Sequence, residues 1–319
     1  MRSHVSFFAA AFSAAVLMAA AAPAGAQQVP DTLFDTRIAR PAWERGKGPR
    51  LLLDEAHRNF HTLDGRYRPF ADLARNDGFR VAANREPFTA VSLAAADLVV
   101  IANAMGSDDM GSPQAESAAF TAAECAAMRA WVESGGALLL IADHSPFGAA
   151  TSSLARALGV DLRNSYAGDP LYGESDNPTS VIYTAGRGLD TTHVIVRGRD
   201  ASERVTRVKT FTGESVAGPR GSAMVLALSD SSYDDAISIT ETHLLQGPMP
   251  PERRSSARGR AQAVAFELGK GRVVVLGEAA MLSAQLAGPG GRYRMGMNQP
   301  GNDNRQFAIN VLRWLGRGL

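Results

Sequence analysis

Acidic, imidazole and hydroxyl side chains directly follow an apolar run at residues 138–142, and such side chains carry acid–base chemistry. The residues after the run are Asp143, His144 and Ser145. A histidine exchanges a proton near neutral pH, and a neighbouring carboxylate can hold its ring or move a proton itself. A second carboxylate, Glu278, comes after another apolar run and a glycine. We therefore expect Asp143, His144, Ser145 and Glu278 to be the catalytic residues.

Two further segments supply polar side chains of similar kinds. The residues that we expect to bind ligand are Asp54, Glu55, His57 and His61, which follow an earlier apolar run, and Asn304, near the start of the last amphipathic segment. His57 and His61 have the i, i+4 spacing of a zinc-binding pair, although the residues around them do not favour a helix. A divalent metal, zinc in the first place, is the cofactor that this pattern suggests.

Each of these residues also has a structural interpretation. Asp143 could cap the helix predicted after it, and Asp303 could cap the last helix. Glu278 could pair with an arginine. Ser145 could be a nucleophile, but the following Pro146 removes a backbone N–H that an oxyanion hole would use. The sequence alone leaves these alternatives open.

The apolar runs before these residues alternate with amphipathic segments, as in a doubly wound α/β protein. Uninterrupted runs such as 98–102 and 138–142 predict strands that are buried on both faces, with the connecting helices as cover. Ligands in such sheets bind outside the carboxyl ends of the strands, so polar groups from separate segments should converge there. Between about 160 and 262 the alternation stops, and short β-like pieces take over. We expect an α/β fold with a doubly wound, mostly parallel sheet and an inserted antiparallel β-rich segment.

The first residues have the pattern of a secretory signal peptide. Arg2 precedes a long apolar run, which ends in a proline and the small residues Ala24, Gly25 and Ala26. We expect cleavage after Ala26 and a periplasmic or secreted product without a membrane span. The remaining chain divides into an N-terminal extension at 27–48 and a single α/β domain at 49–319, which carries the insertion at about 160–262.

Composition narrows the class of partner. The 33 Lys and Arg residues nearly balance the 32 Asp and Glu residues, so no basic field favours nucleic acid. The single cysteine, Cys125, excludes an intramolecular disulfide, and its place within a predicted amphipathic helix capped by Thr121 indicates structural burial. The ligand that we expect is a small molecule, a glycan or a peptide.

The order of the motifs resembles that of class I glutamine-amidotransferase-like proteins. The segments that carry the resemblance are LLLDEAH, ADLVVIANA, GGALLLIADHSPFG, GKGRVVVLGEAAMLSAQ and DNRQFAINVLRWL, and they look most like secreted bacterial proteins of unknown function with this fold. The resemblance implies a nucleophilic cysteine in the turn at 143–145, where this chain has none. It also implies a His-Glu pair after the later strand, where Glu278 is followed by two alanines. Glutamine hydrolysis through a thioester is therefore not expected.

Two functions remain from the residues. The first is an exported hydrolase-like enzyme, with or without a metal, that uses the His/Asp/Glu pocket at the carboxyl edge of the sheet. The second is a non-catalytic periplasmic binding or scaffold domain for a sugar, a peptide or an envelope component. Several imidazoles and acids at one edge favour the enzyme, because unpaired buried charges are costly in a site for a neutral ligand.

Overall fold

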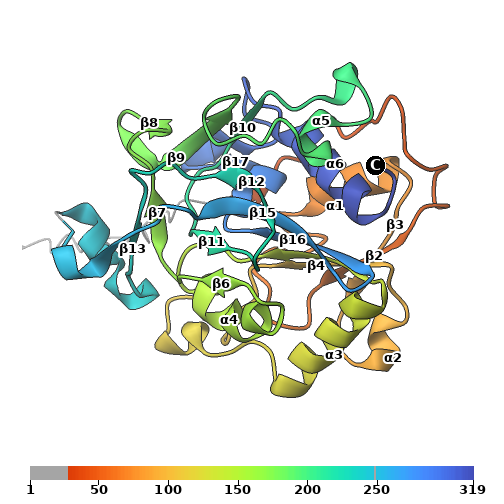
Figure 1. Ribbon diagram of the computed structural model, residues 1–319, viewed down its shortest axis with the longest axis horizontal. Helices are drawn as coiled ribbons and strands as arrows, with labels where there is room; N and C mark the ends of the chain where they lie inside the picture. The colour runs from red at the N-terminus through yellow and green to blue at the C-terminus, as the bar shows by residue number, and fades with distance from the viewer. Residues whose placement is uncertain (1–27, 248) are drawn as a thin grey trace, which may run out of the picture.

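The structure is a computed structural model, and it describes residues 28–247 and 249–319 (Figure 1). The expected signal peptide at 1–26 lies outside the described residues. No helix in the part of the chain that the structure describes is long and apolar enough to cross a membrane.

A nine-stranded sheet runs through the molecule, with the strand order β3-β2-β4-β5-β16-β15-β11-β6 and with β12 paired to β15 (Figure 1). Its parallel strands are β3 (Arg80–Asn84), β2 (Arg50–Asp54), β4 (Leu98–Ala102), β5 (Ala137–Ile141) and β16 (Gly271–Leu276). Its antiparallel strands are β15 (Ala261–Leu268), β11 (Val216–Ala217), β6 (Asp161–Leu162) and β12 (Ala223–Ala227). The fold is therefore mixed α/β, as the class predicted from the sequence requires, with a sheet that is mixed and not only parallel.

Helices cover both faces of this sheet, which explains the uninterrupted apolar runs. Every residue of β4 and β5 is buried. On one face the core includes α1 (Arg68–Asn76) and α6 (Asn304–Leu315). On the other face it includes α3 (Ala122–Ser134) and α4 (Phe147–Ala157), with the short α2 (Ala90–Leu93) beside α3. Thr121 and Glu124 form the expected capping box of α3, and Cys125 is buried within that helix.

The insertion contributes to the main sheet as well as to smaller ones. Its strands β6, β11 and β12 extend the main sheet beyond β15, and two antiparallel sheets lie beside it. These sheets consist of β8 (Gly173–Glu174), β9 (Asn177–Thr184) and β10 (Arg207–Lys209), and of β7 (Tyr166–Gly168), β13 (Tyr233–Asp235) and β14 (Arg254–Ser256). The short helix α5 (Val194–Arg197) packs on α6.

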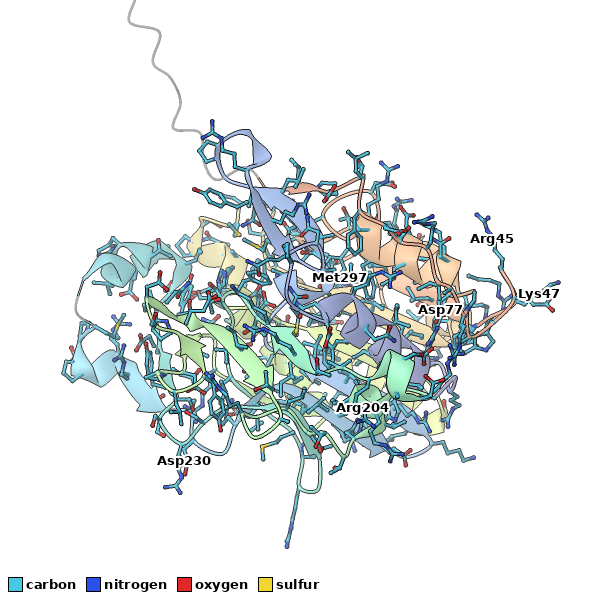
Figure 2. All side chains as sticks on the ribbon, turned by 90° about the horizontal axis from the view of Figure 1, so that it is seen from above. Arg45, Lys47, Asp77, Arg204, Asp230 and Met297 are labelled. Atoms are coloured by element: carbon cyan, nitrogen blue, oxygen red, sulfur yellow. The ribbon has the colours of Figure 1, made fainter. Side chains whose placement is uncertain are left out.

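The N-terminal extension runs along the molecule and ties distant segments together. Its strand β1 (Val29–Pro30) pairs with β17 (Ala284–Ala287), which pairs with β18 (Tyr293–Gly296). Figure 2 shows Arg45 and Lys47 at the tip of a loop that projects from the molecule. Before this loop, the carbonyl of Arg40 accepts a hydrogen bond from the buried Arg313 of α6 (2.9 Å).

Short 3-10 helices complete the connections: η1 (Pro113–Glu116), η2 (Ala201–Glu203), η3 (Ile239–Gln246), η4 (Pro251–Arg253), η5 (Ala280–Leu282) and η6 (Pro289–Gly291). Two of them position the site. Glu116 ends η1, and η5 begins directly after the segment that carries Glu278.

Candidate functional site

A pocket of about 400 Å³ lies at the carboxyl ends of the parallel strands. The polar side chains of its lining include Asn103 after β4, Asp143 and His144 after β5, Glu278 after β16, His61 and Arg66 before α1, and Gln285 in β17. Its apolar walls include Phe60, Met110, Phe147, Phe211 and Met295. His61, Asp143, His144 and Glu278 are thus the sequence-predicted site residues that the fold brings to this pocket.

Two buried acids, Glu278 and Asp143, face this pocket. Both oxygens of Glu278 accept backbone hydrogen bonds at the start of η5, from Ala280 (2.8 Å) and Met281 (2.7 Å). Asp143 accepts a hydrogen bond from the N–H of His144 (2.8 Å). Burial raises the pKa of both carboxyls, and the charge of Asp143 raises the pKa of Glu278 further. Because two like charges in a buried site disfavour double ionisation, the pair retains a proton to higher pH than exposed carboxyls do.

His144 has a defined tautomer and a defined orientation. Its Nδ1 lies 2.7 Å from the backbone carbonyl oxygen of Ser145. A carbonyl only accepts, so Nδ1 must carry the hydrogen, and Nε2 is the nitrogen that can take a proton. The ring stacks on Tyr166, with ring centroids 4.6 Å apart. His144 is therefore oriented as a proton acceptor.

Buried polar atoms without hydrogen-bond partners mark this pocket. Within the pocket lining these atoms are His61 Nδ1, Arg66 Nε and Gln285 Oε1, and other such atoms among the described residues lie elsewhere in the molecule. The ring of His61 stacks on Tyr67 at 4.5 Å, and burial followed by the charge of Arg66 lowers its pKa to about 3. His61 is therefore neutral at pH 7. Buried polar groups in folded proteins nearly always have partners, so unpartnered ones around a cavity indicate a ligand site.

Ser145 does not line the pocket, although its neighbours in the sequence do. Its side chain is fully buried, and Oγ donates a hydrogen bond to Glu116 Oε1 in η1 (2.7 Å). This hydrogen bond directs the hydroxyl away from the cavity. The geometry therefore does not favour the expected role of Ser145 as a catalytic residue.

Asp54 and His57, which we expected at the ligand site, form a closed network beside it. His57 Nδ1 lies 2.8 Å from Asp54 Oδ2, and Nε2 lies 2.9 Å from Glu124 Oε1 of α3. The ring is packed between Phe88 and Phe120, at centroid distances of 4.9 and 4.4 Å. His57 thus links the end of β2 to α3, and neither it nor Asp54 lines the pocket. Sequence spacing did not reveal this, because Glu124 lies 67 positions further along the chain.

Glu55 and Asn304, the other residues expected to bind ligand, also have partners within the protein. Glu55 accepts the backbone N–H of Leu63 (2.9 Å) and pairs with Arg85 (3.0 Å). The amide of Asn304 accepts the N–H of Lys209 (2.9 Å) and donates to its carbonyl (2.7 Å). Both residues hold chain segments together and lie outside the pocket lining.

Sequence reasoning missed Arg66 and Gln285. Arg66 lies five positions after His61, in the same loop, and this proximity was the one signal that could have indicated it. Gln285 comes from β17, which pairs with the N-terminal extension, and nothing in its local sequence distinguishes it.

The residues present do not fit the zinc site that the sequence suggested. Both ring nitrogens of His57 are bonded to carboxylates, so this side chain has no nitrogen left for a metal. Within residues 28–247 and 249–319, no group of three or more His, Cys, Asp and Glu side chains is arranged to hold a metal ion. We therefore derive no chemistry through a metal.

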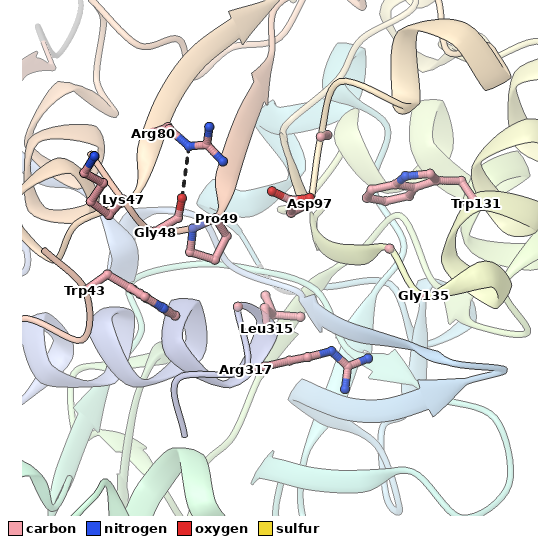
Figure 3. A pocket seen from close by; sticks show the side chains of 13 residues that line it. Trp43, Lys47, Gly48, Pro49, Arg80, Asp97, Trp131, Gly135, Leu315 and Arg317 are labelled. Atoms are coloured by element: carbon pink, nitrogen blue, oxygen red, sulfur yellow. Dashed lines mark hydrogen bonds between the residues drawn. The ribbon is translucent and has the colours of Figure 1, made fainter. Parts of the chain in front are cut away.

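A larger hollow, of about 550 Å³, lies at the opposite edge, near the amino ends of the parallel strands (Figure 3). Trp43, Trp131 and Arg317 contribute to it, and Arg80 donates a hydrogen bond from Nε to the carbonyl of Gly48 (3.1 Å). No lining side chain that the structure describes has a buried polar atom without a partner. We therefore prefer the pocket at the carboxyl edge, which also holds the buried acids Asp143 and Glu278, to this hollow as the candidate site.

Comparison with known proteins shows a fold and no activity. No family model matches the chain, and no curated protein matches it. The mmIFT52 N-terminal domain matches at a TM-score of 0.57 and 15% identity, over 83% of this chain and 97% of that domain. At this identity the likeness shows a shared fold alone.

Two more distant matches have TM-scores below 0.5. A thua-like protein from Parabacteroides merdae ATCC 43184 matches at 0.47 and 13% identity, over 85% of this chain and 91% of that one. A cytoplasmic protein from Salmonella typhimurium LT2 matches at 0.45 and 14% identity, over 84% and 97% of the two chains. At these TM-scores and identities, neither match carries an argument about this chain.

Proposed function

We propose that this chain is a hydrolase-like enzyme in which His144 is the general base and Glu278, paired with Asp143, is the general acid. The observation that supports it is one pocket holding two buried carboxyls with raised pKa values and an imidazole whose Nε2 is available. Carboxyls whose pKa values are raised by burial, sharing a cavity with an imidazole, are typical of acid–base catalysis. We also propose that the parallel strands form the core of a doubly wound fold. The pocket lies at the carboxyl edge of these strands, where ligands bind in such folds.

The roles follow from the protonation states. His144 Nε2 would take a proton from a water molecule as the water attacks the substrate. Glu278, the acid whose pKa is raised by burial and by Asp143, would donate its proton to the leaving group. Asp143 would remain the ionised member of the pair. Each proton transfer of this kind contributes about 10²- to 10⁴-fold to a rate.

Turnover of generic ester and glycoside probes tests this proposal. The probes are p-nitrophenyl acetate and p-nitrophenyl glycosides, assayed with the wild-type chain and with His144→Gln and Glu278→Gln. Glutamine is preferred to alanine at 278, because its oxygen can still accept one of the two backbone hydrogen bonds. We expect each variant to lose at least about 10²-fold in kcat/KM while its Tm stays within a few degrees of wild type.

His193→Gln is a matched control, because His193 caps the short helix α5 and is not part of the pocket lining. It should retain wild-type turnover. Absence of turnover on every probe, combined with saturable binding of small ligands in the same pocket, would support the alternative of a non-catalytic binding domain.

We also propose that the protein is exported to the periplasm or the medium. This part of the proposal depends on the sequence of residues 1–26 alone. N-terminal sequencing of the exported protein should return Gln27 as the first residue. A mature protein that begins at Met1 would contradict this part of the proposal.

A further inference from the structure

We propose that the pocket binds a small molecule that carries one carboxylate next to an apolar body, and that Arg66 is the side chain that holds the carboxylate. This inference rests on the proposed function, because it takes the same pocket as the substrate site. It adds a chemical class of substrate, which the acid–base groups alone do not define.

Arg66 is a partly buried cation of the pocket lining that forms no ion pair with any carboxylate of the described residues. Its guanidinium carbon lies 3.9 Å from the centroid of the Phe60 ring, which holds the planar group against one wall of the pocket. Its Nη1 makes a long hydrogen bond of 3.4 Å to the carbonyl of Phe60, and its Nε has no partner among the described residues. Burial lowers the pKa of Arg66, and no carboxylate opposes this effect. Arginines near a protein interior are normally paired, so a ligand anion would complete this site.

The other walls define what accompanies the carboxylate. The rings of Phe60 and Phe147 lie 5.6 Å apart, centroid to centroid, and Phe211 also lines the cavity. Aromatic walls of this kind bind flat or aliphatic apolar groups. The neutral ring of His61 and the amide of Gln285 each have an unpartnered atom, which can bond to an uncharged polar group of the ligand.

A carboxylate fits the charges of the pocket better than a phosphate does. Arg66 is the one permanently charged cation among the lining residues that the structure describes, and Asp143 and Glu278 line the same cavity. A dianion would face one positive charge and two acids, whereas a carboxylate matches one guanidinium in charge and in its planar, two-pronged geometry. We therefore exclude phosphate esters from the substrate class.

Binding of benzoate, benzamide and inorganic phosphate to the full chain at pH 7 tests this assignment. Benzoate and benzamide have the same size and ring and differ in the charge that Arg66 would recognise. The titrations use wild type, Arg66→Gln and Arg66→Lys. Arg68→Gln is the matched control, because Arg68 lies two residues further along, at the start of α1, and its side chain is half-exposed. Calorimetry at up to about 10 mM ligand covers the affinity range of molecules of this size.

We expect wild type and Arg68→Gln to bind benzoate at least about tenfold more tightly than benzamide, and Arg66→Gln to lose this preference. Arg66→Lys should keep part of the preference for benzoate, because lysine keeps the positive charge. Comparison of the two variants therefore separates loss of charge from loss of fold. Equal binding of benzoate and benzamide by wild type, no binding of either, tighter binding of phosphate, or an unchanged preference in Arg66→Gln would each overturn the assignment. Turnover reports separately on the enzyme: hydrolysis of neutral esters without a preference for benzoate would refute this inference alone, and the preference without any turnover would refute the proposed function alone.

Discussion

Replacement of His57 by phenylalanine separates this structural histidine from His144, the histidine that we propose to be catalytic. Phenylalanine keeps a ring between Phe88 and Phe120 but removes both nitrogens that bond to Asp54 and Glu124. The two carboxylates would then remain almost fully buried without the cation between them. We expect a variant that is less stable but retains its function.

The size of the loss follows from the burial of this network. Breaking a buried ion pair by removing one partner costs about 3–5 kcal/mol. For a fold of about 290 residues, an unfolding entropy of about 2.1 cal/mol/K per residue corresponds to about 0.6 kcal/mol per degree. His57→Phe should therefore lower Tm by about 5–8 °C at pH 6.

The effect should depend on pH in a defined direction. Burial alone would lower the pKa of His57, but the hydrogen bonds and charges of Asp54 and Glu124 outweigh it, and the net pKa is raised above its usual value of 6.5. A raised pKa contributes stability that is fully present below the unfolded pKa and is lost as pH rises through the folded pKa. The Tm difference between wild type and His57→Phe should therefore be largest near pH 6 and shrink towards pH 9. Glu124, whose pKa is lowered to about 2, stays ionised over this range.

Differential scanning calorimetry at pH 6, 7, 8 and 9 measures this difference, and turnover or benzoate binding at 25 °C measures function. His144→Gln is the companion variant, with little change in Tm and loss of turnover. A His57→Phe protein with wild-type Tm, or a Tm difference that grows with pH, would refute the assigned network. Loss of benzoate binding in a folded His57→Phe protein would show that His57 belongs to the ligand site.

Three further predictions concern single residues. Asp77→Asn should lower Tm by about 2–5 °C in calorimetry, because Asp77 holds the buried guanidinium of Arg313 with two charged hydrogen bonds (2.8 and 2.6 Å), while Glu203 keeps a second ion pair with it (2.9 Å); an unchanged Tm would contradict this. Cys125→Ser should cost about 1 kcal/mol in denaturant unfolding and leave turnover intact, because burial raises the pKa of this thiol and keeps it protonated; loss of turnover in the folded variant would identify a missed nucleophile. Ser145→Ala should keep turnover, and phenylmethylsulfonyl fluoride should not inactivate wild type, because the hydroxyl faces Glu116; rapid inactivation would show that Ser145 reaches the substrate.

Several elements of the fold could be predicted from local sequence. The buried strands β4 and β5 were indicated by uninterrupted apolar runs, and α3 by its capping box and terminal glycine. The antiparallel part of the main sheet could not be predicted in the same way. Strands β6, β11 and β12 have two to five residues each, and their pairing with β15 or with each other depends on tertiary contacts.

The candidate site could also be predicted only in part from the sequence. Asp143 and Glu278 could be predicted to meet, because the carboxyl ends of the parallel strands β5 and β16 lie side by side. The sequence did not indicate which way each polar side chain would point after its strand. His57 follows β2, which is separated from β5 by β4, and its ring bonds to Glu124 of α3 instead of lining the pocket. Arg66, which comes from an irregular loop, has no periodic pattern that would place it.

The turn after β5 shows why orientation decides chemistry. His144 and Ser145 are adjacent, but the imidazole lines the pocket while the hydroxyl bonds to Glu116. The hydroxyl that does line the pocket, on Thr212, donates to the carbonyl of Phe211 (2.5 Å), and no thiol is present among the lining residues that the structure describes. The pocket therefore has groups that move protons but no hydroxyl or thiol that is positioned to attack. Under the proposed hydrolase function, water activated by His144 is therefore the attacking group, and we propose no acyl-serine or thioester intermediate.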